Sequence, residues 1–131
     1  MKFSDSYQKD DSLFQKAQTY DRAKADQDED EIRIAKGVLD EHLTEYRRFL
    51  TVGEDPGKPK RAWTPFQRTI RYASRYAESY LDKEEPEKVV TEIRRDMREE
   101  GRELDHAGDQ ALPQGIAEWI VQEIVEERDQ V

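Results

Sequence analysis

Apolar residues recur at steps of three and four along most of the chain, which is the spacing of one face of an α-helix. Five segments share this spacing: residues 13–25, residues 30–50, and the stretches that begin at Thr64, Pro86 and Pro113. No internal repeat and no strand-like alternation of apolar and polar residues is visible. We therefore expect an all-α protein of about five helices, arranged as a helical bundle.

Capping residues mark where two of these helices should begin. Thr64 and Gln67 fit a capping box, and Pro65 suits the first helical position between them. Ser12 and Gln15 fit the same box ahead of the first apolar segment. The sequence thus predicts that the first helix begins after Ser12 and the third after Thr64.

The chain is organised as one domain, because its 131 residues are enough for a single modest core. Residues 26–31 hold five carboxylates in six positions, which is typical of a solvated joint or an acidic first helical turn. We expect residues 1–131 to form a single α-helical domain with its helical core at 29–131. Residues 1–28 are expected to form an N-terminal helical arm, which either packs on this core or reaches out to another chain.

The amino-acid composition favours a protein that assembles with other chains over a self-contained domain. The apolar fraction is 34% and the charged fraction 40%, against about 45–50% and about 25% in typical domains. Little apolar surface is left to offset chain entropy, so either the core is small and narrow or another chain completes part of the apolar surface. We favour assembly. The formal net charge is −9 and Asn is absent. Such a surface stays hydrated in concentrated salt, which favours a salt-adapted source, the alternative being an ordinary acidic helical protein.

The sequence lacks the residues that several classes of catalytic and metal-binding site require. There is no Cys, which excludes a thiolate nucleophile and a sulfur-based zinc site. No phosphate-binding glycine loop, nucleophile elbow or zinc-finger spacing occurs. The first residues carry no apolar targeting segment, and no run approaches the ~20 apolar residues of a membrane span. We expect a non-enzymatic protein without cofactor, metal or membrane contact, in the cytoplasm or in a virus particle assembled there.

Charge is strongly segregated along the sequence. Residues 56–77 carry six positive charges and no carboxylate, whereas the segments on either side are acidic. This basic segment supplies candidate partner-binding residues in which cations and aromatic rings interleave: Lys58, Lys60, Arg61, Trp63, Arg68, Arg71, Tyr72, Arg75 and Tyr76. Such residues can bind phosphates and unpaired bases. They can equally pair with acidic helices of the same chain or of a neighbouring copy.

The fifth segment has the most hydrophobic face of the chain. Trp119, Ile120 and Ile124 lie on it at helical spacing, with glutamates around them. A face of this kind is either core or a helix that docks into a partner's groove. We therefore include these three residues among the candidates for partner binding.

Four carboxylates form a further pattern. Glu100 and Glu103 make an E-x-x-E step, and Glu126 and Asp129 make a later E-x-x-D step. This pattern resembles the motif of the all-α nucleoside triphosphate pyrophosphohydrolases, the MazG-like family. The resemblance covers these two tetrapeptides, and it implies that the four carboxylates hold Mg²⁺ against a triphosphate.

Three functions are consistent with these features. The first is a non-enzymatic α-helical assembly protein that acts in several copies, such as a head–tail connector of a virus particle, with acidic arms on the basic segment of the next copy. The second is a nucleic-acid-binding protein that uses residues 56–77, or a DNA mimic that uses the acidic helices. The third, implied by the resemblance, is a magnesium-dependent pyrophosphohydrolase.

Overall fold

The computed structural model describes residues 2–53, 56–57, 59–99 and 112–130. Within them lie five α-helices: α1 (Lys2–Asp26), α2 (Glu29–Leu43), α3 (Pro65–Leu81), α4 (Pro86–Glu99) and α5 (Gln114–Asp129). Two short 3₁₀ helices are η1 (Thr44–Phe49) and η2 (Lys60–Ala62). The described residues contain no strand, so the predicted all-α fold of about five helices is confirmed.

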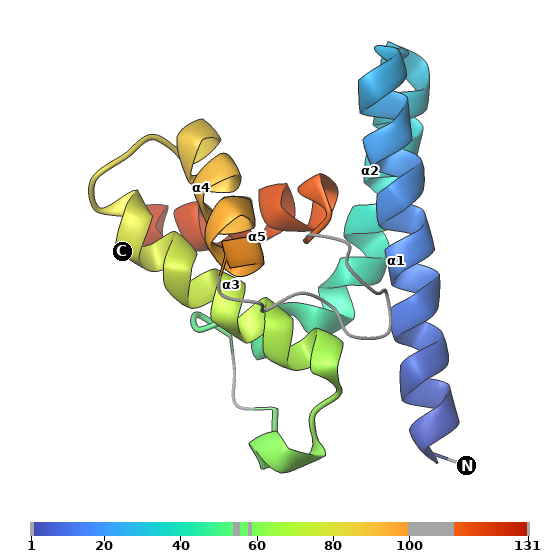
Figure 1. Cartoon of the computed structure of the whole chain (residues 1–131), viewed down its shortest axis with the longest axis vertical. Helices are drawn as coiled ribbons and strands as arrows, with labels where there is room; N and C mark the ends of the chain where they lie inside the picture. The colour runs from blue at the N-terminus through green and yellow to red at the C-terminus, as the bar shows by residue number, and fades with distance from the viewer. Residues whose placement is uncertain (1, 54–55, 58, 100–111, 131) are drawn as a thin grey trace.

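Helices α1 and α2 form an antiparallel pair that Figure 1 shows side by side. The turn between them is a Schellman motif, because the Gln27 N–H donates to the Lys24 carbonyl and the Asp28 N–H donates to the Ala23 carbonyl. Gln27 takes a left-handed φ of 57° to make this reversal. Asp28 then caps α2 by accepting from the Glu31 N–H at 3.2 Å.

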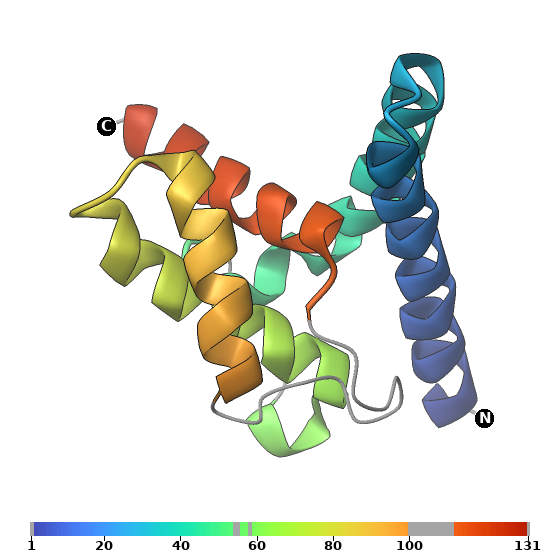
Figure 2. The same cartoon turned by 45° about the horizontal axis from the view of Figure 1, so that its top comes forward.

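The turn places the acidic run of residues 26–31 at the tip of this helical pair. Every residue of the run is exposed. The tip points away from α3, α4 and α5 in both views (Figures 1 and 2). Residues 26–31 therefore form an anionic projection of the molecule.

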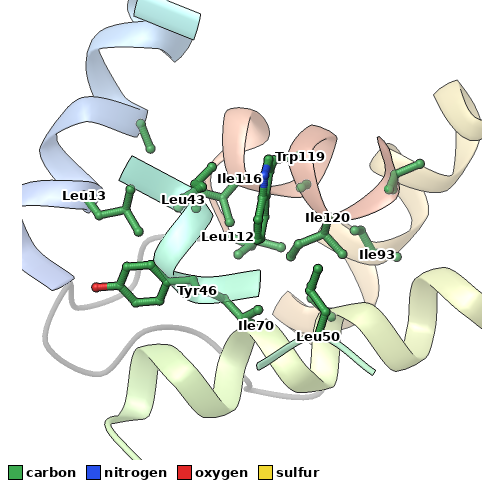
Figure 3. Close-up of a cluster of buried hydrophobic side chains, with 14 of the residues drawn as sticks. Leu13, Leu43, Tyr46, Leu50, Ile70, Ile93, Leu112, Ile116, Trp119 and Ile120 are labelled. Carbon is green, nitrogen blue, oxygen red and sulfur yellow. The ribbon is translucent and has the colours of Figure 1, made fainter. Parts of the chain in front are cut away.

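Helix α5 joins the α1–α2 pair to the other helices, since it contacts α1, α2, α3 and α4. Its apolar face is buried among side chains from these helices and from η1 (Figure 3). The largest fully buried side chains of the core are Phe66, Leu13, Leu39, Leu43, Leu50, Ile70, Ile93, Met97, Leu112, Ile116 and Ile120. On α1, Leu13, Ala17 and Tyr20 are buried in this core, so α1 packs on its own chain.

The start of α3 follows the predicted capping box. Thr64 Oγ1 accepts from the Gln67 N–H at 3.2 Å, and Gln67 Oε1 accepts from the Thr64 N–H at 2.9 Å. The predicted box at Ser12 is wrong, because α1 begins ten residues earlier, at Lys2. Ser12 lies inside that helix and accepts a hydrogen bond from Lys16 Nζ at 2.8 Å.

The predicted helix over residues 30–50 is shorter than expected. It ends as an α-helix at Leu43 and continues as the tighter η1. The tightening accompanies two contacts with distant residues: the Tyr46 hydroxyl donates to Asp10 at 2.6 Å, and Arg47 pairs with Glu127 at 2.9 Å. His42, in the last turn of α2, is exposed.

Candidate cationic interaction surface

Five residues of the predicted basic segment surround one hollow of about 190 Å³. They are Arg61, Trp63, Arg68, Arg71 and Tyr72, and we call this site the basic hollow. The described residues that line it include three arginines and no carboxylate. The structure thus brings together residues that sequence reasoning had grouped by composition alone.

The capping box of α3 explains how the hollow is built. It fixes the first turn of α3 directly after Trp63, so that Arg68, Arg71 and Tyr72 project from the following turns. The η2 turn carries Arg61 back toward that helix. Arg68 Nη2 donates to the Arg61 carbonyl oxygen at 3.3 Å, which ties η2 to α3.

Trp63 and Arg71 form the floor of the basic hollow rather than its rim. Trp63 is only 6% exposed, and its ring meets the Phe49 ring edge to face at 5.2 Å between centroids. The Arg71 guanidinium carbon lies 5.0 Å from the centroid of the Trp63 ring. Arg71 Nε also donates to the Phe49 carbonyl oxygen at 2.7 Å. Arg71 therefore connects α3 to η1 as well as adding charge.

The outer side of α3 continues the cationic site beyond the hollow. Arg68 and Arg75 are exposed, whereas Tyr72 and Tyr76 are half-buried against the core. The Arg75 guanidinium carbon lies 5.9 Å from the Tyr72 ring centroid. We define the α3 basic surface as the residues that a partner could reach here: Arg61, Arg68, Tyr72, Arg75 and Tyr76.

Two further candidates from the sequence fall outside this description. Lys58 lies outside the described residues, and only the backbone of Lys60 is described, within η2. The α3 basic surface is accordingly defined without them.

Two larger hollows lie beside η1, with volumes of about 420 and 400 Å³. Both are lined by Lys9, Glu45 and Tyr46. Lys9 and Glu45 form an exposed ion pair at 3.8 Å, so opposite charges already offset each other there. The described lining of the basic hollow carries charge of one sign.

The predicted docking face on α5 is corrected by the structure. Trp119 is 3% exposed, and Ile120 and Ile124 are fully buried. Figure 3 shows Trp119 and Ile120 among core side chains from the other elements. Because the chain's own helices cover these three residues, they belong to the core and offer no surface to a partner.

The carboxylate pattern is described only in its second half. Glu126 and Asp129 are exposed on α5, and Glu126 accepts a hydrogen bond from Gln122 at 3.1 Å. Glu100 and Glu103 lie outside the described residues. Among the residues that are described, no group of three or more His, Asp or Glu side chains is arranged to hold a metal ion.

Sequence reasoning missed a polar cluster that joins α1 to α5. Asp21 accepts from the backbone N–H groups of Gln114 and Gly115, both at 3.0 Å, and so caps α5 from another helix. Burial raises the pKa of this carboxyl above its ordinary value. Close by, the Tyr20 hydroxyl donates to Glu118 at 2.7 Å, and burial followed by this bond raises the pKa of Tyr20. No local signal relates residues more than ninety positions apart.

Comparisons of the chain with protein-family models, curated proteins and solved structures give no match. Among the described helices, none combines the length and apolar character needed to cross a membrane. The chemistry of the exposed surfaces is therefore the basis for assigning a function.

Proposed function

We propose that this chain is a non-enzymatic assembly protein that acts in several copies. The α3 basic surface of one copy binds an acidic surface of another copy. One observation carries the proposal: three arginines converge on a hollow without a described carboxylate, in a chain of net charge −9. Every copy therefore also supplies the acidic partner that the hollow suits.

The aromatic residues of the α3 basic surface contribute to binding as much as its charged residues do. An exposed ion pair contributes only about 0.2–1 kcal/mol, so arginines alone would give a weak contact. Tyr72 and Tyr76 add apolar area beside Arg68 and Arg75. Tyrosine and arginine are the residue types that most often dominate protein–protein binding energy.

A protein partner suits the surface better than a nucleic acid does. Trp63, the ring best able to stack on a base, is buried and covered by the Arg71 guanidinium. The net charge of −9 also repels a polyanion at long range. The burial of Trp63 does not oppose binding to an acidic helix, whose carboxylates meet the arginines at short range.

Nucleic acid remains a second candidate, favoured by Arg61, Arg68 and Arg75 together with the half-buried ring of Tyr72. About three phosphate contacts would make log K for single-stranded DNA fall with log salt at a slope of about −2. An affinity that does not change with salt would exclude this mode of binding.

The role that we assign to the assembly is that of a structural connector, such as one in a virus particle. Contact between two different surfaces of identical copies repeats head to tail, and it closes into a ring where the rotation allows. A small helical protein with opposite charges on separate elements is suited to such repetition. Its place of action is then the cytoplasm or a particle assembled there.

The test is sedimentation velocity on the wild type and on an Arg68→Glu/Arg75→Glu variant at low salt. Both arginines are exposed, so the reversal leaves the core and the Arg71 contacts intact, and it removes the hydrogen bond from Arg68 to the Arg61 carbonyl oxygen. A Lys88→Glu/Arg98→Glu variant makes the same change in net charge on the exposed side of α4.

We expect the wild type and the control to be oligomers and the α3 variant to be monomeric. Equal mass for wild type and α3 variant would contradict the proposal, and wild-type mass that rises only with added DNA would replace it with the second candidate.

A further inference from the structure

Two apolar side chains on the outward side of α2 are exposed to solvent. Ile34 is 58% exposed and Val38 is 39% exposed, and they are the exposed large hydrophobic residues of the described chain. They lie one helical turn apart, so they form one small apolar patch. Gly37 beside them has no atom within 4 Å of where a Cβ would be, so the patch is open to a partner.

The helical register explains this exposure. Ala35, Leu39 and Leu43 are buried against the core. Ile34 and Val38 therefore face away from it, because α2 turns through about 100° per residue. β-branched residues are poor helix formers in exposed positions, where no packing offsets their loss of rotamer freedom. The two residues gain their burial energy only if another molecule covers them.

Carboxylates lie at both ends of this apolar patch, and one of them, Asp30, also forms an exposed ion pair with Arg33 at 3.5 Å. Asp30 and Glu41 lie on the same side of α2, one turn before Ile34 and about one turn after Val38, and both are exposed. We call Asp30, Ile34, Gly37, Val38 and Glu41 the α2 outer face. A second α2 outer face would be a poor partner, since it would bring carboxylates against carboxylates.

The α3 basic surface is the complement of this face. It has a central pair of rings, Tyr72 and Tyr76, at the same spacing as Ile34 and Val38. Arg68 takes the position of Asp30, and Arg75 lies beside the second ring, at the position of Gly37. Ridges formed by residues four apart can pack into each other when two helices cross. Tyrosine rings would then cover the apolar patch while the opposite charges meet at its edges.

We infer that the α2 outer face of one copy docks on the α3 basic surface of the next copy. This inference rests on the proposed function, and it names the acidic surface that the assembly uses. The two surfaces lie on separate elements, because α2 packs on α1, α5 and η1, whereas α3 packs on α4, α5 and η1. Each copy can thus use both at once, which a ring or a filament requires.

A mixing experiment tests the inference with two charge-reversed variants. The first is Arg68→Glu/Arg75→Glu, which makes the α3 surface acidic. The second is Asp30→Arg/Glu41→Arg, which makes the α2 outer face basic. Each variant alone brings like charges together, so each should sediment as a monomer. An equimolar mixture should recover a higher mass, because the reversed surfaces of one variant match those of the other. A Glu87→Arg/Glu99→Arg variant on α4 makes the same charge change away from both surfaces and should keep the wild-type mass.

An apolar variant tests the same contact without any change in charge. Ile34→Ser/Val38→Ser removes side chains that are already exposed, so circular dichroism should show an unchanged fold. We expect self-association to weaken by about tenfold or more, as for residues at the centre of an interface.

The results of these experiments distinguish a failure of this inference from a failure of the proposed function. If the wild type assembles and the Arg68→Glu/Arg75→Glu variant does not, the proposed function stands. Within that result, wild-type mass for Asp30→Arg/Glu41→Arg, or a mixture that stays monomeric, would overturn the α2 contact alone. A monomeric wild type would remove both.

Discussion

At the scale of single residues, Glu118 illustrates how this charged chain uses its half-buried polar groups. Its carboxylate accepts hydrogen bonds from the Tyr20 hydroxyl at 2.7 Å, from Gln114 Nε2 at 2.9 Å and from Lys24 Nζ at 3.2 Å. Burial by itself raises the pKa of Glu118, but these three donors outweigh it and hold the pKa below the usual 4.5. The ionised carboxylate therefore stabilises the contact between α1 and α5.

Replacing Glu118 by Gln should reduce stability in a way that depends on pH. Because the folded pKa is lowered, the contribution of Glu118 is present above pH 4.5 and is lost as pH falls through the folded pKa. At pH 7 we expect Glu118→Gln to lower the free energy of unfolding by about 1–2 kcal/mol. Urea denaturation should show a smaller difference near pH 3. A Glu126→Gln control on the exposed side of α5 should change little at either pH, and a Glu118→Gln deficit that is equal at both pH values would contradict this account.

At the scale of elements, α5 depends on a close approach to α1 and α2. A Cβ on Gly115 would lie 2.6 Å from Tyr20 Cδ2 and 2.7 Å from Leu39 Cδ2. Both neighbours are buried, and Tyr20 is also held by its bond to Glu118, so neither can move aside easily. The first turn of α5 can pack here only because Gly115 has no side chain.

Two glycine substitutions should therefore act in opposite directions. We expect Gly115→Ala to destabilise the fold by about 1–3 kcal/mol through overpacking. Gly37→Ala, on the open side of α2, should stabilise it by about 0.5–1 kcal/mol through helix propensity. Thermal denaturation in the Arg68→Glu/Arg75→Glu background measures both changes in stability without a contribution from assembly. A Gly115→Ala protein as stable as its parent would show that α5 does not pack as described.

Elements with local signals could be predicted from the sequence, and those that depend on distant contacts could not. The start of α3 was predicted because Thr64, Pro65 and Gln67 lie within one turn. The change from α2 to η1 was not, because it accompanies contacts of Tyr46 and Arg47 with α1 and α5. The same applies to the candidate site. The grouping of Arg61, Arg68 and Arg71 could be read from composition, whereas the burial of Trp119, Ile120 and Ile124 depends on how the helices pack.

The exposed apolar patch on α2 shows that the spacing of apolar residues does not by itself predict which of them are buried. Val38 fits the apolar stripe of its helix by spacing, yet it is 39% exposed. Ile34 lies outside that stripe and is exposed more fully. The pattern identifies a helix that has a buried face, but the width of that face depends on which helices cover it.

At the scale of the whole molecule, opposite charges occupy separate surfaces. The α3 basic surface lies on α3 and η2, while the acidic tip at residues 26–31 and the α2 outer face lie on α2 and on its turn from α1. Self-association would bring these surfaces together and would cover Ile34 and Val38. The high charged fraction of the chain, 40%, is then consistent with a protein that works among copies of itself.

The most direct test of this account is the solution mass of the wild-type chain, measured by light scattering over a range of concentrations without nucleic acid. One chain weighs 15.5 kDa. We expect a discrete multiple of that mass at low salt, because contact between opposite charges is strongest there. A mass of one chain at every concentration, from low to multimolar salt, would contradict the proposal that the protein assembles with itself.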